Sequence, residues 1–210
     1  LSTLSLPGSE IDPSVIAAWT ELKSLWDVNL DDNEISTGTL VWLGNIKSLR
    51  RLSLNRTQLK NEASEKLGNL TQLSELQLAG VEIDKKKIRP LLQANNIESL
   101  NLSGWQIDEE MMNWLLDTKS LMLLTLHDCQ ITPHQLQQFM DRMPPLSLDL
   151  GPQTATLDTA TQRELERRVR RLTLGTIEGW RTAIRKRIPQ SQDDQVTYRE
   201  SDRIKIENFR

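Results

Sequence analysis

The sequence predicts an α/β fold built of stacked strand–helix units, and three features of the chain predict it. Leucine is unusually frequent, with 35 among the 210 residues. Apolar triplets of the form LxxLxL recur every 24 residues. Within each period the apolar spacing changes from that of a strand to that of a helix. One short strand and one short helix cannot bury a core alone, so neighbouring units must stack.

The triplets keep an unbroken interval along most of the chain. Their last apolar residue falls at positions 6, 30, 54, 78, 102, 126, 150 and 174. The alternation Leu-x-Leu is typical of a strand with one buried face. A further aliphatic residue follows each of the first six triplets after five positions, at Ile11, Ile35, Leu59, Ile83, Ile107 and Ile131.

Helical spacing follows in the second half of the repeats. In the fifth repeat Asp108 suits a helix cap, and Met111, Met112, Leu115 and Leu116 follow at helical intervals. The first and sixth repeats show the same order, with Asp12-Pro13 before Ile16, Trp19 and Leu22, and Thr132-Pro133 before Leu136, Phe139, Met140 and Met143. Trp19, Trp42 and Trp114 fall on this helical side, where they either pack the helical layer or form an aromatic patch for a second partner.

The motif LxxLxLxxxxI resembles that of the leucine-rich-repeat family over about residues 1–188. The resemblance implies a right-handed solenoid shaped like a horseshoe, with a parallel β-sheet on the concave face and short helices on the convex face. We expect about eight repeats over residues 1–188. Residues 189–210 are expected to cap them, with a β-hairpin formed by the alternating runs 196–198 and 204–206.

The family places asparagine in the turn below each strand, where its side chain bonds backbone groups. Here the first six of these positions hold Ser9, Asn33, Thr57, Val81, Trp105 and Cys129. We expect only Ser9, Asn33, Thr57 and Cys129 to suit that role. Cys129 is therefore expected to be a small buried residue rather than a reactive thiol.

Two parts of the chain depart from the regular pattern. Pro144 and Pro145 replace the first leucine of the seventh repeat, so we expect strand pairing to be weakest there. The chain begins within a repeat and without methionine, so we expect a fragment of a longer protein. A single cysteine, and no signal peptide or apolar membrane span in the sequence, favour a cytoplasmic location.

The sequence shows no constellation of residues typical of catalysis. His127 and His134 lie in no nucleophile or metal-binding motif, and no glycine-rich phosphate loop follows a predicted strand. We expect no catalytic residue, metal site, cofactor or small-molecule substrate, and therefore a protein that is not an enzyme.

The polar residues between the leucines are the candidate functional residues. They alternate with the buried leucines and project from the open face of the sheet. We expect a protein or peptide partner to bind there, with Trp26 as the nearest aromatic anchor; the alternative is that these residues only keep the sheet soluble. The expected contacts are Asp27, Asn29, Asp31, Arg51, Ser53, Asn55, Glu75, Gln77, Ser99, Asn101, Thr125 and His127.

Charge is distributed unevenly along the chain. Residues 1–162 carry 13 basic and 21 acidic side chains, whereas residues 163–210 carry 13 basic and 8 acidic ones. Contact of Arg163–Arg187 with nucleic acid or an anionic membrane is therefore a second hypothesis. Solvated helix ion pairs such as Glu164–Arg168, or head-to-tail attraction in an assembly, explain the same charges. A third functional hypothesis is a regulatory or sensor domain of a larger enzyme.

Overall fold

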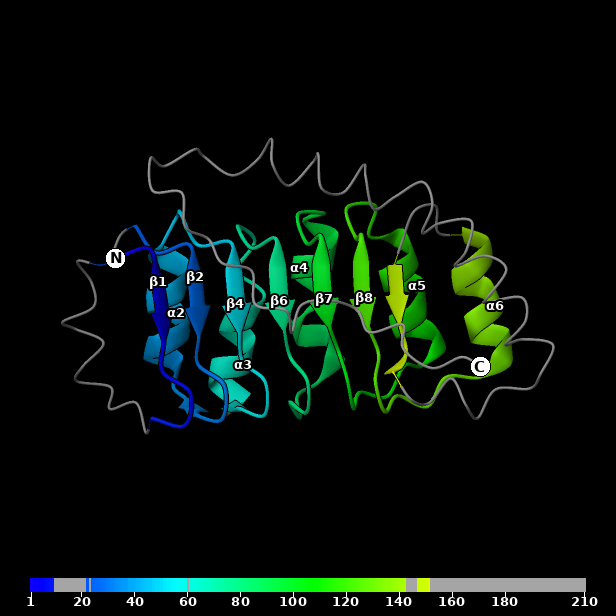
Figure 1. Ribbon diagram of the computed structural model, residues 1–210, viewed down its shortest axis with the longest axis horizontal. Helices are drawn as coiled ribbons and strands as arrows, with labels where there is room; N and C mark the ends of the chain where they lie inside the picture. The colour runs from blue at the N-terminus through cyan, green and yellow to red at the C-terminus, as the bar shows by residue number, and fades with distance from the viewer. Residues whose placement is uncertain (10–21, 23, 60, 143–146, 152–210) are drawn as a thin grey trace, which may run out of the picture. The chain divides into compact units, whose positions relative to one another are not determined.

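The computed structural model describes residues 1–9, 22, 24–59, 61–142 and 147–151. All of these residues belong to the first of the chain's two units, Leu1–Arg167. In this part of the chain, short strands alternate with short helices along the sequence (Figure 1). The structure confirms the predicted α/β class and the predicted parallel sheet.

Seven strands form one parallel sheet whose spatial order is the order of the sequence. Each strand begins 24 residues after the one before it, so every residue pairs with the equivalent residue of the next repeat. Leu4 lies opposite Val28, and Val28 lies opposite Leu52. The strands are β1 (Thr3–Ser5), β2 (Asp27–Asn29), β4 (Arg51–Ser53), β6 (Glu75–Gln77), β7 (Ser99–Asn101), β8 (Leu123–Thr125) and β9 (Ser147–Asp149).

Short helices lie behind this sheet in the view of Figure 1. They are α2 (Thr37–Asn45), α3 (Asn61–Leu67), the 3-10 helix η1 (Lys85–Lys87), α4 (Arg89–Gln93), α5 (Glu109–Asp117) and α6 (Pro133–Arg142). A second, two-stranded parallel sheet joins β3 (Glu34–Ile35) to β5 (Gln58–Leu59). Helices are thus confirmed for repeats two to six, and the helix expected around Ile16 lies outside the described residues.

The helix starts follow from their capping residues. Asp108 accepts a hydrogen bond from the Met111 amide at 2.8 Å, as expected for the residue before α5. Before α6, Thr132 Oγ1 accepts from the Gln135 amide at 3.2 Å, and Gln135 Oε1 accepts from the Thr132 amide at 2.9 Å. These reciprocal bonds form a capping box, which satisfies two backbone donors at the helix start.

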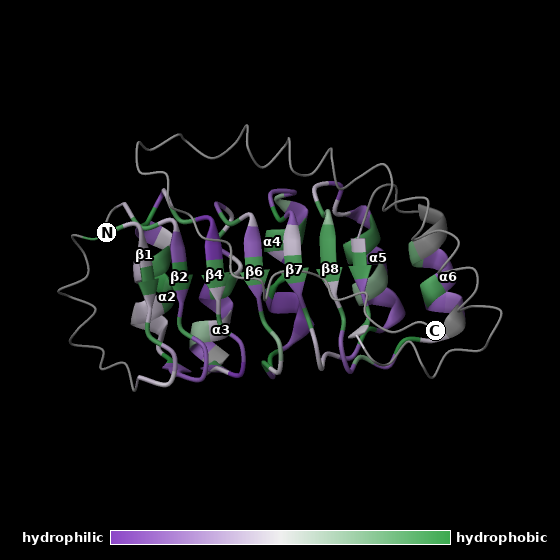
Figure 2. Cartoon of the chain, viewed as in Figure 1, coloured by the Kyte–Doolittle hydropathy of each residue, from purple (hydrophilic) through white to green (hydrophobic). Residues whose placement is uncertain are grey.

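Many of the leucines pack in the core between the sheet and the helices. The inner strands bury their middle residues, and Val28, Leu52 and Leu76 are at most 1% exposed, whereas Leu4 of β1 and Leu148 of β9 are partly buried. In Figure 2, strands β2, β4 and β6 are hydrophobic (green) at their middle and more hydrophilic toward their ends. Helix residues such as Leu43 and Met111 close the core from behind. Full burial of one such side chain stabilises the fold by about 1.5–3 kcal/mol.

A backbone turn with positive φ follows each strand. The residues are Gly8, Asp32, Arg56, Gly80, Gly104 and Asp128, again 24 apart, with φ between 53° and 81°. The seventh repeat has Pro152 at the equivalent position, and proline cannot take a positive φ. There the residue with positive φ is Gly151, at 56°, one position earlier.

The polar turn positions below the strands bind backbone carbonyl groups. Asn33 Nδ2 donates to the carbonyl oxygens of Leu6, Leu30 and Asp31 at 2.8–2.9 Å, and Asn33 Oδ1 accepts from the Ser9 amide at 2.8 Å. Thr57 Oγ1 donates to the Leu54 carbonyl at 2.7 Å. Ser9, in contrast, directs its hydroxyl to the Pro7 carbonyl of its own loop, 3.2 Å away.

Cys129 lies at the same turn position and is 5% exposed. Its Sγ is 3.2 Å from the Leu102 carbonyl oxygen of the preceding repeat. Burial raises the pKa of the thiol, so the unreactive thiol is favoured at neutral pH. The prediction of a small buried residue is confirmed.

The expectation that Trp105 does not suit this role is wrong. Its indole Nε1 donates to the Leu78 carbonyl of the preceding repeat at 2.8 Å, and the residue is 7% exposed. An indole has one donor and no acceptor, so Trp105 replaces the inter-repeat bond that Asn33 makes to Leu6 while its ring fills the turn with apolar surface. Val81, with no donor, fills its own turn as a buried apolar side chain.

Two of the tryptophans on the helical side are described. Trp42 is 5% exposed within α2, which agrees with packing in the helical layer. Trp114 packs against the core from α5 and lies beneath the Lys85 Nζ and the Arg89 guanidinium, 5.5 and 5.1 Å from its ring centroid. Trp19 lies outside the described residues.

Several sequence predictions concern residues that the structure does not describe. These are the prolines of repeat seven, the eighth repeat, the basic stretch 163–187 and the hairpin expected within 189–210. Strand β9 nevertheless pairs with β8 in the common register, with Asp149 opposite Thr125. Among the described helices, none is long and apolar enough to cross a membrane.

Candidate functional site

The register places the predicted contact residues in rows on the sheet face opposite the helices, here called the polar sheet face. One row begins the strands with Thr3, Asp27, Arg51, Glu75, Ser99, Leu123 and Ser147. A second row ends them with Ser5, Asn29, Ser53, Gln77, Asn101, Thr125 and Asp149. A third row follows directly after the strands with Asp31, Asn55, Ala79, Ser103 and His127.

Part of this face is hollowed into a depression of about 430 Å³ over β1, β2, β4 and β6. It brings together six of the predicted contact residues. The lining consists of Thr3, Leu4, Ser5, Asp27, Asn29, Arg51, Leu52, Ser53, Glu75 and Gln77. The other six predicted contacts do not line it, because they lie after the strands or on β7 and β8.

Arg51 is the central charge of the depression. Its Nε lies 2.9 Å from Glu75 Oε2, and its Nη2 donates to Glu75 Oε1 at 3.2 Å. On the other side its Nη1 is 3.9 Å from Asp27 Oδ2. The guanidinium also lies 5.7 Å from the centroid of the Trp26 ring, within the range of a cation–π contact. Arg51 thus binds Glu75 through two atoms and Asp27 only at longer range.

Of the two carboxylates in the depression, Asp27 and Glu75, the negative charge of Asp27 is less well compensated by Arg51. Burial raises its pKa above the ordinary value of 3.8, and the nearby Arg51 offsets this only in part. Its side chain is 32% exposed, so a ligand in the depression can reach it.

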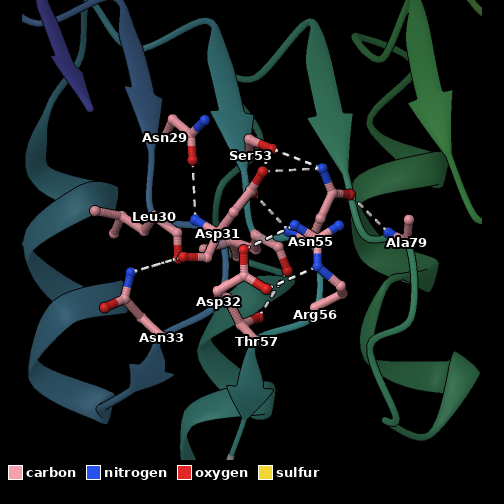
Figure 3. A network of polar contacts seen from close by, with 11 residues as sticks. Asn29, Leu30, Asp31, Asp32, Asn33, Ser53, Asn55, Arg56, Thr57 and Ala79 are labelled. Carbon is pink, nitrogen blue, oxygen red and sulfur yellow. Dashed lines mark hydrogen bonds and ion pairs between the residues drawn. The ribbon is translucent and has the colours of Figure 1, made fainter. Parts of the chain in front are cut away.

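A hydrogen-bonded ladder runs across the strand ends beside the depression (Figure 3). Asp31 Oδ1 accepts from Ser53 Oγ at 2.6 Å and from the Asn55 amide at 2.8 Å. Asn55 Oδ1 in turn accepts from the Ala79 amide of the next repeat at 2.9 Å. The Asp31 amide donates to Asn29 Oδ1 at 2.9 Å. Asp31 and Asn55, both predicted contacts, therefore bind the backbone of the following repeat.

An ion pair continues the ladder at the positions with positive φ. Arg56 Nε and Nη2 each donate to one oxygen of Asp32 at 2.7 Å. This bidentate contact lowers the pKa of Asp32. Because both side chains are exposed, it serves to align neighbouring turns and contributes little to stability.

The remaining predicted contacts lie on the later strands. Asn101 Oδ1 accepts from the amide and the hydroxyl of Ser103, at 3.0 and 2.7 Å. The His127 amide lies 3.2 Å from Ser103 Oγ. Its Nε2 is 2.9 Å from Asp149 Oδ1 but not in hydrogen-bonding geometry. Ser99 lies opposite Glu75, and Thr125 lies opposite Asn101; neither residue lines the depression.

The described residues offer no arrangement typical of metal chemistry. Among them, no group of three or more His, Cys, Asp or Glu side chains could hold a metal ion. What the polar sheet face can do chemically is exchange hydrogen bonds and ion pairs with another molecule.

Two features of this face were missed in the sequence. The ladder could have been found from polar residues 24 apart directly after the strands, because Asp31, Asn55 and Ser103 share one repeat position. The contact between Trp26 and Arg51 could have been found from their adjacent repeats, in which Trp26 precedes β2 and Arg51 begins β4.

Comparison with known proteins gives matches among solved structures. No protein-family model matches this chain, and no curated protein matches it. Among solved structures, the chain is similar to an internalin from Listeria monocytogenes str. 4b F2365, with a TM-score of 0.44 and 19% sequence identity. The similarity covers 72% of this chain and 54% of that one, so the chain spans about half the length of the internalin structure.

Proposed function

We propose that this chain is a non-catalytic protein-interaction module, a leucine-rich-repeat solenoid that binds a protein or peptide on its polar sheet face. The observation that carries this proposal is the depression over β1, β2, β4 and β6. It is lined by the hydrogen-bonding and charged side chains that begin and end these strands. Such a surface suits recognition of a polypeptide, which presents both backbone polar groups and side chains.

The residue types around the depression support the proposal. Tryptophan and arginine are enriched among residues that dominate the binding energy of protein interfaces. Trp26 is 41% exposed, and the Arg51 side chain is 46% exposed. The two are in contact, so each restricts the motion of the other before a partner arrives, which reduces the entropy lost on binding.

The ladder supports the proposal in a different way. Hydrogen bonds between repeats hold the strand ends through Asp31 and Asn55, so the neighbouring depression is formed in advance. We assign these two residues to positioning and assign direct contact to Asp27, Arg51, Glu75 and Gln77. This division refines the predicted contact set.

The test uses peptides selected from a random phage-displayed library on the full chain. Their affinity is measured for the wild type and for a triple variant, Asp27→Arg, Arg51→Glu and Glu75→Arg. The triple variant keeps alternating charges, so the ion pairs can re-form and the melting temperature should not change. We expect binding to weaken at least about thirtyfold, as for a change of 2 kcal/mol at interface hot spots.

A matched control carries the same charge changes on the helical side. Glu65 and Lys87 form an exposed ion pair at 3.2 Å, and Asp117 is exposed at the end of α5. The variant Glu65→Arg, Lys87→Glu and Asp117→Arg should bind the peptides as the wild type does. Equal affinity of all three proteins would refute the assignment of binding to the polar sheet face.

A further inference from the structure

The polar sheet face carries an excess of negative charge in its described part. Its three rows contain four carboxylates and one guanidinium, together with His127. The carboxylates belong to Asp27, Asp31, Glu75 and Asp149, and the guanidinium belongs to Arg51. A partner that binds this face gains most if it brings positive charge, since complementary charges favour association.

The four carboxylates differ in how far their charge is already compensated. Asp31 accepts hydrogen bonds from Ser53 and from Asn55, and Glu75 binds Arg51 through both of its oxygens. Asp149 is half exposed, accepts a hydrogen bond from the Gly151 amide at 3.0 Å and lies 2.9 Å from His127 Nε2. Asp27 combines partial burial with a cation that lies 3.9 Å away, beyond hydrogen-bonding distance.

Trp26 adds a second group that attracts cations beside Asp27. Its ring already lies under the Arg51 guanidinium at 5.7 Å, and the residue remains 41% exposed. The negative face of an indole attracts lysine and arginine more strongly where water is partly excluded. The Asp27 carboxylate and the Trp26 ring both lie near the Arg51 guanidinium, at 3.9 and 5.7 Å, so both can attract a positive charge at this place.

Building on the proposed function, we propose that the depression binds a lysine or arginine side chain of an extended peptide segment, with its positive charge on the Asp27 carboxylate beside Trp26. The depression spans three strand spacings, roughly 14 Å. At about 3.3 Å per residue, an extended segment of about four residues crosses it. Arg51 lies on the far side of Asp27 from β1, so the incoming cation is expected to approach Asp27 from the β1 side, where repulsion by the guanidinium is weakest.

The favourable free energy of binding comes from pairing the charge of the Asp27 carboxylate. Burial without full pairing makes its charged form costly, and an incoming cation restores the interaction that burial removed. The raised pKa of Asp27 agrees with this view, because it reports that burial outweighs the attraction of Arg51. Binding of the basic side chain should lower that pKa.

The test is a double-mutant cycle between the full chain and the peptides selected on it. Each lysine or arginine of a peptide is replaced by glutamine in turn, and the protein carries Asp27→Asn. We expect one peptide position and Asp27→Asn each to weaken binding about tenfold, as for loss of a charged hydrogen bond. The protein and peptide changes together should weaken binding no more than either change alone.

Asp149→Asn is the matched control on the same face. Asp149 lies on β9, five strand spacings or roughly 24 Å from Asp27, beyond the Debye length of about 8 Å at physiological salt. The substitution Asp149→Asn removes one negative charge without altering the depression, so it should leave the affinity for the peptides unchanged. Equal effects of Asp149→Asn and Asp27→Asn would overturn the proposal and indicate attraction by net charge alone.

Failure of this inference is distinguishable from failure of the proposed function. If no peptide is selected, or if the triple charge reversal leaves binding intact, both fail. If the triple reversal abolishes binding but selected peptides lack basic residues, or tolerate glutamine in their place, only the lysine or arginine site is refuted. The peptide substitutions decide this without any protein variant, so an effect of Asp27→Asn on folding cannot obscure the result.

Discussion

Replacing Asn33 by alanine should destabilise the protein more than any other single change at the turn positions. The side chain is 4% exposed and makes four hydrogen bonds to backbone groups. Two join it to its own repeat, at Leu30 and Asp31, and two join it to the preceding repeat, at Leu6 and Ser9. Because the two protons of Nδ2 are shared among three carbonyl oxygens, these contacts amount to about three full hydrogen bonds, and at about 1 kcal/mol for each the loss is about 3 kcal/mol.

Two corrections act on this figure in opposite directions. The Leu30 carbonyl is buried with Asn33, and leaving it without a donor adds to the cost. The other three partners are only partly buried, so water can replace some of the lost bonds. We therefore expect a loss of about 2–4 kcal/mol, a large part of the 5–15 kcal/mol typical of a folded domain.

Urea unfolding followed by circular dichroism measures this loss, with Thr57→Val as the reference. Thr57 occupies the equivalent turn position but contributes one side-chain hydrogen bond, to Leu54, so its replacement should cost about 1 kcal/mol. The slope of the transition must be compared as well, because stacked repeats can unfold in parts. A cost for Asn33→Ala no larger than that for Thr57→Val would refute the claim that the inter-repeat bonds stabilise the stack.

Three further predictions follow from buried groups. Trp105→Phe removes the indole donor to the buried Leu78 carbonyl, which keeps the Val81 amide as a donor at 3.3 Å, and should lower the free energy of unfolding by about 0.5–1.5 kcal/mol, measured by the same urea titration. Asp27→Asn should raise the melting temperature at pH 7. Folding raises the pKa of Asp27 above 3.8, so the native state holds this proton more tightly, and stability falls as pH rises through the folded pKa. The gain should vanish as pH is lowered to about 3.8, and a lower melting temperature at pH 7 would contradict the sign. Cys129 should react with a thiol reagent on the order of a hundredfold more slowly in the native than in the urea-unfolded protein, since burial raises its pKa and blocks access; equal rates would show that the turn opens.

Much of the fold could be predicted from the repeat length. A constant period of 24 residues makes each residue pair with its equivalent, and Leu4, Val28 and Leu52 lie opposite one another as the triplets predict. The alternation of leucine with polar residues decides which side chains are buried, because successive strand residues point to opposite faces. The rows of the polar sheet face follow from these two facts.

The candidate site could be predicted as a face but not as a depression. Asp27, Arg51 and Glu75 were expected as three equivalent contacts, yet Arg51 pairs closely with Glu75 and only distantly with Asp27. Asn55 was expected to meet a partner, and only the structure shows that its Oδ1 also accepts from the Ala79 amide. Sequence spacing gives the row of a residue, but it does not give the rotamer or the neighbour that its polar atoms reach.

What the sequence alone specified about this protein is its periodicity, and with it the strand register and the leucine core, because hydrophobic burial depends on the pattern of residue types. What only the tertiary structure decided is the use of each polar group. Trp105 could be recognised as a substitute for asparagine only once its indole was seen 2.8 Å from the Leu78 carbonyl of the repeat before it. Asp27 could be recognised as undercompensated only from its burial and its distance to Arg51. Hydrogen bonds and ion pairs depend on distances of a few ångströms between repeats, and such distances exist only in the folded chain.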